Sequence, residues 1–339
     1  MASKQPRSRP MPTIKDVAEA AGVSRATVSR AFSKPALLNS TTVEHVRTIA
    51  SQLGYVPNQL ARALSTGRAG NIGLIVPDIA NPFFSTLIRA AQAHAYANGY
   101  LTILGDSDEF PALEDVLLGK LAPQVEDFIL PSPRLSTQRI KAHAGRRPLV
   151  LLNRDVPGIP RVLIDAAAGF EEAVDLLASF GHSSVVYVGA PKASWANQQR
   201  QAAILKASSR NCLAVKVLHV PRPSYDAGRS CTKEVLATGA TAVLAVDDLV
   251  AQGVMAGLNE RGVLVPDDIS VIGCDDIIAA TTHPPLSTVA VHCRDAGRRS
   301  VELLIAAVNG RVLPETKLVV KSQFISRQTV APPRHSKNK

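Results

Sequence analysis

The sequence has few cysteines and no long apolar run. Its four cysteines, Cys212, Cys231, Cys274 and Cys293, are widely spaced, without a CxxC pair or a neighbouring pair of histidines. This spacing fits neither a disulfide framework nor a zinc site, so we expect reduced thiols and no bound metal. No apolar run approaches the ~18 residues of a membrane-spanning helix, and none follows the basic residues at the start. We therefore expect a cytoplasmic protein without a membrane span or an export signal.

Motifs that mark common catalytic sites are also missing. The sequence contains no glycine-rich phosphate loop, nucleophile elbow or His/Cys metal spacing. The doublets Asp247-Asp248 and Asp275-Asp276 could be read as the paired carboxylates of a glycoside hydrolase or as metal ligands. Adjacent residues at a strand end point in different directions, however, so neither doublet is a facing pair. We predict a protein that is not an enzyme and needs no cofactor.

Positive charge is concentrated near the two ends of the chain, within a formal net charge of +10. Residues 1–70 hold ten Lys and Arg against three Asp and Glu, whereas residues 71–333 hold 25 of each sign. This segregation points to a polyanionic partner for the first segment. Residues 1–11 are predicted to be a disordered basic arm, and residues 331–339 a solvated basic tail.

A stretch near the start predicts two short helices joined by a tight turn. Apolar residues recur at i, i+3 and i+4 in both halves of it: Ile14, Val17, Ala18 and Ala21, then Val28, Ala31 and Phe32. Between them, Gly22 permits a sharp exit from the first helix, and the Ser24 hydroxyl can cap the second. This is the pattern of a helix-turn-helix, although an ordinary helical hairpin within a larger domain shares it.

The outward face of the second helix carries groups suited to DNA. We predict that Arg25 and Ala26 choose bases. The predicted backbone contacts are made by Ser24, Thr27, Ser29 and Arg30, with Thr13 anchoring the first helix. A third helix follows, capped by Asn39 or Thr41, ended by Gly54 and with Leu53 among its inward residues, which completes a DNA-binding domain over residues 12–56.

Residues 57–70 form a predicted hinge helix and linker. The run TIKDVAEAAGVSRATVSR, followed by LGYVPNQLARAL, resembles the lactose/purine/galactose repressor (LacI-type) family of bacterial transcription regulators. The resemblance implies a short helix that orders on DNA, pairs with that of its dimer mate in the minor groove and wedges a leucine between base steps. It assigns the wedge to Leu64, within a helix that starts near Asn58, and Ala61 is small enough for two such helices to approach. The alternative is a linker helix whose leucine docks on its own domain.

The rest of the chain alternates strands and helices. Ten apolar runs predict strands: 72–76, 101–104, 128–130, 149–152, 162–164, 185–188, 215–218, 242–246, 269–272 and 288–291. Segments with helical spacing separate most of them, for example 83–97, 168–180, 197–209 and 249–261. This order predicts two α/β lobes with doubly wound parallel sheets. The runs IGLIVPDIANPFF, FGHSSVVYVG, DDISVIGCDD and PLSTV resemble the family's sensor domain, similar to periplasmic sugar-binding proteins, which implies a two-lobed effector-binding and dimerisation domain over residues 71–330.

Ligands of such sheets lie beyond the carboxyl ends of the strands. The predicted effector-binding residues follow several strand ends: Asp78, Phe83, Phe84, Arg154, Trp195, Asn197, Arg200, Asp247 and Asp275. The resemblance places four of them, both phenylalanines, Arg200 and Asp275, at positions that line the effector pocket in several family members. Alternatives remain: Asp248 and Asp276 as helix caps, the phenylalanines as plain core, and Trp195 as a packed loop residue.

Three dipeptides depart from the family pattern and leave the effector's identity open. Asp165-Ala166, Glu126-Asp127 and Asp247-Asp248 stand where the family has Asp-Asn, Asp-Gly and Asn-Asp. A carboxylate at Asp247 favours a ligand rich in donors or cationic. The expected protein is a homodimeric repressor that binds a palindromic double-stranded operator under control of a sugar-like effector. Its rival is a cytoplasmic sugar-binding protein without a DNA-binding role.

Overall fold

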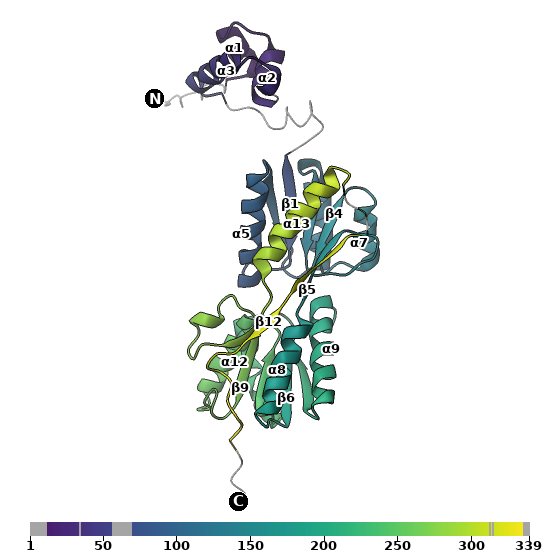
Figure 1. The fold of residues 1–339 in the computed structure, drawn as a ribbon, viewed down its shortest axis with the longest axis vertical. Coiled ribbons are helices and arrows are strands. Elements are labelled where there is room, and N and C mark those ends of the chain that lie inside the picture. The colour runs from purple at the N-terminus through teal and green to yellow at the C-terminus, as the bar shows by residue number, and fades with distance from the viewer. Residues whose placement is uncertain (1–11, 34, 56–69, 312, 314, 335–339) are drawn as a thin grey trace, which may run out of the picture. The chain divides into compact units, whose positions relative to one another are not determined.

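A computed structural model describes residues 12–33, 35–55, 70–311, 313 and 315–334, and the chain divides into two compact units, residues 1–69 and 70–339 (Figure 1). The predicted hinge residues Asn58, Ala61 and Leu64 lie outside the described residues, as does the predicted basic arm. Within the described part of the chain, no helix is long and apolar enough to cross a membrane.

The first unit contains a three-helix core. Its helices are α1 (Ile14–Ala20), α2 (Arg25–Ser33) and α3 (Ser40–Leu53), with a short 3-10 helix, η1 (Pro35–Leu37), between the last two. Val17, Val28, Ala31 and Val46 are fully buried where the three helices meet. The residues that the apolar periodicity predicts to face inward from α1 and α2 form or pack against this core, which confirms that prediction.

The ends of α3 follow the predicted capping chemistry. Asn39 Oδ1 accepts a hydrogen bond from the Thr41 backbone N at 3.2 Å, and Gly54 ends the helix with φ of 70°, a backbone conformation that glycine adopts without strain. The prediction that Leu53 faces inward was wrong, since 39% of its surface is exposed. Gly54 turns the chain immediately after this residue, and the last residue of α3 that is fully part of the core is Ala50, one turn earlier.

The second unit has two lobes, each built on a six-stranded sheet. The sheet of the first lobe has the order β11-β5-β4-β3-β1-β2 and is parallel throughout. Its strands are β1 (Asn71–Val76), β2 (Leu101–Asp106), β3 (Asp127–Pro131), β4 (Leu149–Leu152), β5 (Arg161–Asp165) and β11 (Lys317–Lys321). Its helices are α5 (Pro82–Ala97), α6 (Pro111–Leu121), η2 (Ala122–Gln124), α7 (Thr137–Ala144) and α13 (Cys293–Val308).

The second lobe repeats this plan with the strand order β12-β10-β9-β8-β6-β7, in which only β12 is antiparallel to its neighbour. Its strands are β6 (Ser184–Gly189), β7 (Ala214–His219), β8 (Ala242–Ala245), β9 (Ser270–Asp275), β10 (Ser287–Ala290) and β12 (Gln323–Ile325). Its helices are α8 (Ala167–Ser179), α9 (Trp195–Arg210), α10 (Tyr225–Ser230), α11 (Thr232–Ala237), α12 (Asp248–Asn259) and η3 (Ala279–Thr281).

The chain passes between the lobes three times, near Ala166, His292 and Ser322 (Figure 1). After the second passage α13 packs against α5 of the first lobe, and each lobe is built from two separate segments of the chain. All three passages lie on the side of β5, β10 and β11, away from the edge strands β2 and β7. This side is therefore the hinge between the lobes.

The ten predicted strands are confirmed, but β11 and β12 were missed. Both are only partly buried, because each lies at the edge of its sheet. An edge strand shows a weaker apolar pattern than a central strand buried on both faces. In the predicted solvated tail, Arg334 is exposed and pairs with Asp267 at 2.9 Å and with Asp268 at 2.7 Å.

Candidate ligand cleft and nucleic-acid interface

The predicted DNA-reading residues lie on one exposed face of the first unit. Arg25, Ala26, Ser29 and Arg30 project from α2, opposite the buried Val28. Neither arginine forms an ion pair with any residue that the structure describes. Two guanidinium groups on an exposed helix face are thus available to phosphates or base edges.

Side-chain hydrogen bonds stabilise the first turns of α1 and α2. Thr13 precedes α1, and its backbone N and Oγ1 both donate to Asp16 Oδ2, at 2.7 and 2.8 Å. The Thr27 backbone N donates to Ser24 Oγ at 3.1 Å, which is the cap that the sequence predicts for α2. The hydroxyls of Ser24 and Thr27 also lie 2.9 Å apart. Both side chains therefore help to hold the first turn of α2, in addition to the phosphate contacts that the sequence predicts for them.

An inner cavity of about 60 Å³ lies between the two lobes at the carboxyl ends of their strands. Six of the predicted effector-binding residues line it: Phe83, Phe84, Asn197, Arg200, Asp247 and Asp275. The two phenylalanine rings lie 5.0 Å apart in an edge-to-face arrangement, and both are also part of the hydrophobic core. The core alternative and the binding prediction are therefore compatible for these rings.

Arg200 is the central charged group of the inner cavity. It is 8% exposed, its Nη1 donates to the Val246 carbonyl at 2.6 Å, and its Nη2 lies 3.5 Å from Asp275 Oδ1. Burial raises the pKa of Asp275 well above its usual range, although Arg200 acts in the opposite direction. A buried guanidinium with further N–H groups is suited to fix hydroxyl or carbonyl oxygens of a ligand.

The doublet Asp247-Asp248 does not act as a carboxylate pair. Asp247 caps α12, since its Oδ1 accepts from the Val250 backbone N at 2.8 Å, and its Oδ2 accepts from Asn81 Nδ2 at 3.1 Å. Asp248 instead accepts from Thr288 Oγ1 at 2.6 Å and from the Ile277 backbone N. The cap of α12 is thus Asp247, and the predicted alternative of Asp248 as the cap was wrong.

Asn197 supplies a buried polar atom without a protein partner. Its Oδ1 accepts from the Tyr187 hydroxyl and from the Ala190 backbone N, both at 2.9 Å. Its Nδ2 is buried and has no hydrogen-bond partner among the described residues. A buried donor left unpaired destabilises the fold, so this atom, in a side chain that lines the inner cavity, suits a ligand acceptor or a bound water.

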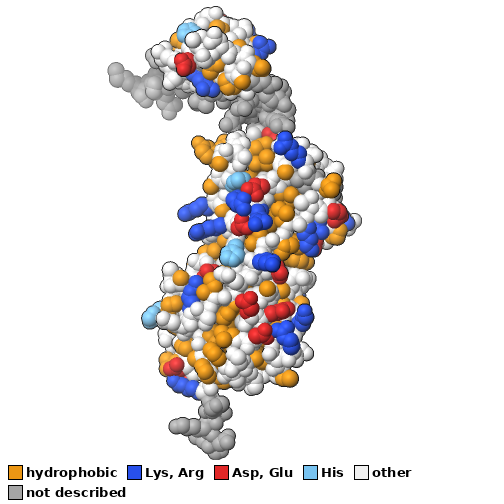
Figure 2. All heavy atoms as spheres, viewed as in Figure 1, with side chains coloured by type: hydrophobic (Ala, Val, Ile, Leu, Met, Phe, Trp, Pro, Cys, Tyr) orange, Lys and Arg blue, Asp and Glu red, His pale blue; other side chains and the backbone are white. Residues whose placement is uncertain are grey.

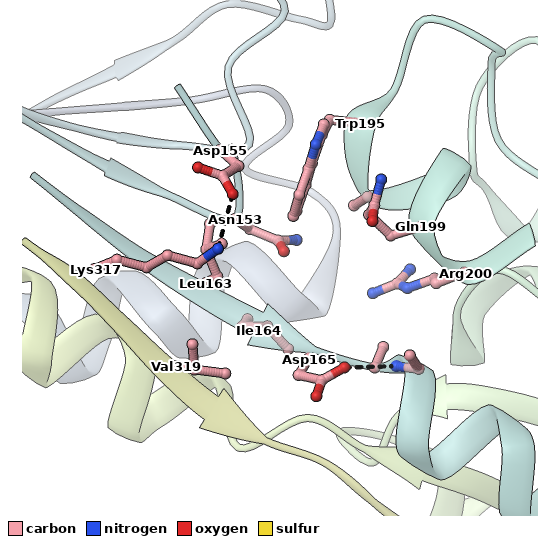
Figure 3. Close-up of a pocket in the computed structure, with 13 residues that line it drawn as sticks. Asn153, Asp155, Leu163, Ile164, Asp165, Trp195, Gln199, Arg200, Lys317 and Val319 are labelled. Carbon is pink, nitrogen blue, oxygen red and sulfur yellow. Dashed lines mark hydrogen bonds and ion pairs between the residues drawn. The ribbon is translucent and has the colours of Figure 1, made fainter. Parts of the chain in front are cut away.

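An outer cavity of about 260 Å³ adjoins the inner one on the hinge side (Figure 3). Trp195 and Gln199 of α9 lie on one side of it, and Asp155 and Lys317 lie on the other. Lys317 Nζ donates to Asp155 Oδ2 at 2.9 Å. The predicted effector residue Trp195 thus lines a cavity, but a different one from the residues around Asp275.

The edge of the cleft opposite the hinge is closed by charge pairs. Arg222, in the loop after β7, pairs with Asp78 at 3.0 Å and also with Asp108 of the first lobe. Asp78 was predicted to bind effector, yet it lines neither cavity and holds this interlobe contact instead. Arg154 does not line either cavity, and its Nη2 lies 3.3 Å from Thr137 Oγ1.

Sequence reasoning missed several residues that line the cavities. Glu109 and Arg134 form an ion pair in the wall of the inner cavity, after β2 and β3. The rule of strand ends would have found them, because both follow strands that the sequence predicts. Lys317 and Val319 lie on β11, so no rule could place them once that strand had been missed.

The neighbouring Glu114 leads to a testable pH dependence. Its side chain is 1% exposed, Oε2 accepts from the Arg134 backbone N at 2.7 Å, and burial raises its pKa from 4.5 to about 7. Because the pKa of Glu114 is higher in the folded than in the unfolded chain, its contribution to the free energy of unfolding is complete below pH 4.5 and is lost as pH rises through about 7. We therefore expect Glu114→Gln to raise the free energy of unfolding at pH 8 by about 2 kcal/mol relative to the parent, but not at pH 4. Urea unfolding at both pH values checks this; a gain of equal size at both would contradict it.

Both units of the chain resemble known protein families. A family model described as bacterial regulatory proteins, lacI family, matches residues 13–58, and one described as a periplasmic binding protein-like domain matches residues 174–330. The chain is 31% identical to the ribose operon repressor of Bacillus subtilis, over 94% of this chain and 98% of that protein.

Solved structures extend the likeness to the full architecture. The lac repressor dimer bound to operator and the anti-inducer ONPF matches with a TM-score of 0.84 and 26% identity, covering 94% of this chain and 99% of that one. A lacI-family transcriptional regulator from Enterococcus faecium with bound ribose matches with a TM-score of 0.70 and 29% identity, covering 77% and 99%.

Proposed function

The chain belongs to the lacI family of bacterial regulatory proteins, and from this membership we propose that residues 12–56 read a palindromic operator while the cleft of residues 71–330 binds a sugar-like effector. The protein is a DNA-binding transcriptional regulator with a headpiece and a two-lobed sensor. We assign no catalytic role to its carboxylates. The observation that carries the operator proposal is the exposure of Arg25 and Arg30 on α2, neither of which forms an ion pair with a described residue.

The distribution of charge supports a DNA-binding role for the first unit, here called the headpiece, and an effector-binding role for the second. The face of the second unit seen in Figure 2 carries Lys and Arg interspersed with Asp and Glu. Ion pairs are numerous in this unit, for example those of Arg298 with Asp295 and Glu302. Most of the excess positive charge, +7 of the net +10, resides in residues 1–70. Binding to phosphates is therefore attributed to the headpiece, with the hinge residues Asn58, Ala61 and Leu64 proposed to enter the minor groove.

A dimer is supported by exposed apolar side chains around the edge strand of the first lobe. Tyr96 of α5 is 76% exposed, Leu101 of β2 46% and Phe110, just before α6, 61%. Large apolar side chains left exposed in β2 and in the segments before and after it favour association with a second copy. Two copies bring two headpieces to the two halves of a palindromic operator.

Arg25→Ala tests the operator reading. We expect this variant to lose preference for the operator over random DNA by about tenfold, because a bidentate arginine contact to a base is worth ~1–3 kcal/mol. A mobility-shift titration on the promoter beside its own gene, at several salt concentrations, measures the preference. A uniform loss on both DNAs would make Arg25 a phosphate contact. The absence of any sequence-selective, salt-sensitive shift by the parent would remove the operator proposal and leave a sugar-binding protein.

Effector control is proposed to act through the hinge. A ligand held by Arg200 and Asp275 of the second lobe and by Phe83 of the first would change the equilibrium between open and closed cleft. Because α5 packs on α13 and lies at the proposed dimer face, closure would also shift the two headpieces relative to each other. The relative with bound ribose supports a sugar as the effector.

A further inference from the structure

The two cavities of the cleft are continuous parts of one binding volume. The inner and the outer cavity share three lining residues, Asn153, Ala196 and Arg200. The inner part is the smaller, about 60 Å³ against about 260 Å³. A ligand ring that contacts Arg200 therefore lies beside an open space larger than the site that holds it.

The cleft has room for a longer ligand on its hinge side. At the edge away from the hinge, Arg222 ties the lobes together through Asp78 and Asp108. Between that edge and the centre, Asn81 Nδ2 donates to Asp247 Oδ2 across the cleft. On its other side, a ligand seated on Arg200 has room to extend toward the hinge, into the cavity beside Trp195.

The lining of the outer cavity combines an aromatic ring with hydrogen-bond acceptors. The ring of Trp195 extends from the start of α9 toward Asn153, and Gln199 follows it one turn later on the same side (Figure 3). Leu163 and Val319 add apolar surface from the hinge strands. Such a combination suits a sugar ring, whose C–H face covers an aromatic ring while hydroxyls around its rim donate to carboxylates and amides.

Charge in the outer cavity is largely compensated. Asp155 pairs with both Lys317 and Arg161. Asp165 adds a carboxylate whose Oδ1 accepts from the Ala167 backbone N at 3.1 Å, and no other partner of it is found among the described residues. Compensated charge favours a neutral ligand over an ionic one, because an ionic ligand would have to displace an existing pair.

We propose that the outer cavity is a second sugar subsite and that the effector is a disaccharide, with one ring on Arg200 and Asp275 and the other stacked on Trp195. This assignment rests on the proposed role of the cleft as the effector site. It adds the length of the ligand and the residue that selects it.

The only tryptophan of the chain makes the subsite directly observable. The full-length protein is titrated with cellobiose, lactose and maltose, with glucose, galactose and ribose, and with cytidine, while the fluorescence of Trp195 is recorded. We expect a saturable change with at least one disaccharide, at an affinity about tenfold above that of its component monosaccharides, since stacking on an aromatic ring contributes up to that factor.

Calorimetry on Trp195→Ala separates the subsite from the rest of the cleft. The variant is expected to bind the disaccharide no better than the monosaccharide, with the monosaccharide affinity unchanged. Leu205→Ala, which removes an exposed apolar side chain of the same helix, α9, that lines neither cavity, should leave both affinities as in the parent.

Three results would overturn the proposal: equal affinities for disaccharide and monosaccharide, a stronger Trp195 response to cytidine than to any sugar, or no saturable response to any probe at millimolar concentration. Mobility shifts with the same ligands keep the two proposals distinct. Release of operator by a monosaccharide that leaves the Trp195 fluorescence unchanged would support effector-controlled operator binding and overturn only the second subsite. A Trp195 response to a disaccharide without any operator binding would support the second subsite and overturn the operator proposal.

Discussion

Arg200→Ala is expected to lower the free energy of unfolding by about 3 kcal/mol and to remove the response to effector, because it breaks a buried charge pair at the centre of the cleft. The guanidinium donates to the Val246 carbonyl and faces Asp275 at 3.5 Å, and both side chains are less than a tenth exposed. Its removal leaves Asp275 without this partner beside the carboxylate of Asp247. Urea unfolding measures the stability, and operator release measures the response.

Two companions of this variant test the electrostatic explanation. Arg200→Lys keeps the charge but not the planar fork, so it should recover stability without recovering effector affinity. Asp275→Asn added to Arg200→Ala removes the stranded carboxylate and should restore part of the lost stability. If the double variant were no more stable than Arg200→Ala alone, the loss would reflect packing rather than an unpaired charge.

Gly253→Ala should be about as destabilising, by about 3 kcal/mol, through overpacking. Gly253 lies in α12 where it crosses α10, and a Cβ there would stand 2.0 Å from the Tyr225 carbonyl oxygen and 2.9 Å from the Arg229 backbone N. These are backbone atoms, so α10 must move as a whole. Urea unfolding at a fixed protomer concentration measures the loss, because dimerisation makes stability depend on concentration.

Gly119→Ala is the matched control. Gly119 lies within α6, and a Cβ there would meet nothing within 4 Å. Alanine loses less conformational entropy than glycine in a helix, so this variant should be more stable by about 0.5–1 kcal/mol. A similar loss in both variants would show that the effect of Gly253→Ala does not arise from contact with α10.

The fold could be predicted where residues act through local periodicity. Val17, Val28 and the apolar runs of the central strands report their own burial, because the pattern of one element is enough to place its buried face. Leu53 shows the limit of this reasoning: it has the right spacing but lies past the last packed turn, at a position that Gly54 determines.

The site could be predicted only in part, because its residues meet through topology. The strand-end rule placed Arg200, Asp247 and Asp275 beside one another, and all three line the inner cavity. Asp78 follows the same rule, but Arg222 engages it from the other lobe, a contact that no sequence spacing encodes. The outer cavity depended on β11, which joins the first sheet from more than 150 residues away and pairs with Arg161–Asp165.

The three passages between the lobes also set an order of completion during synthesis. The described core of the headpiece consists of residues up to 55, which leave the ribosome early. The first lobe lacks the helix that packs on α5, and one edge of its sheet, until Cys293–Val308 and Lys317–Lys321 have emerged. The lobe that begins first in the chain is therefore completed almost last. A nascent chain therefore contains the complete three-helix core of the headpiece long before the cleft between the lobes is complete.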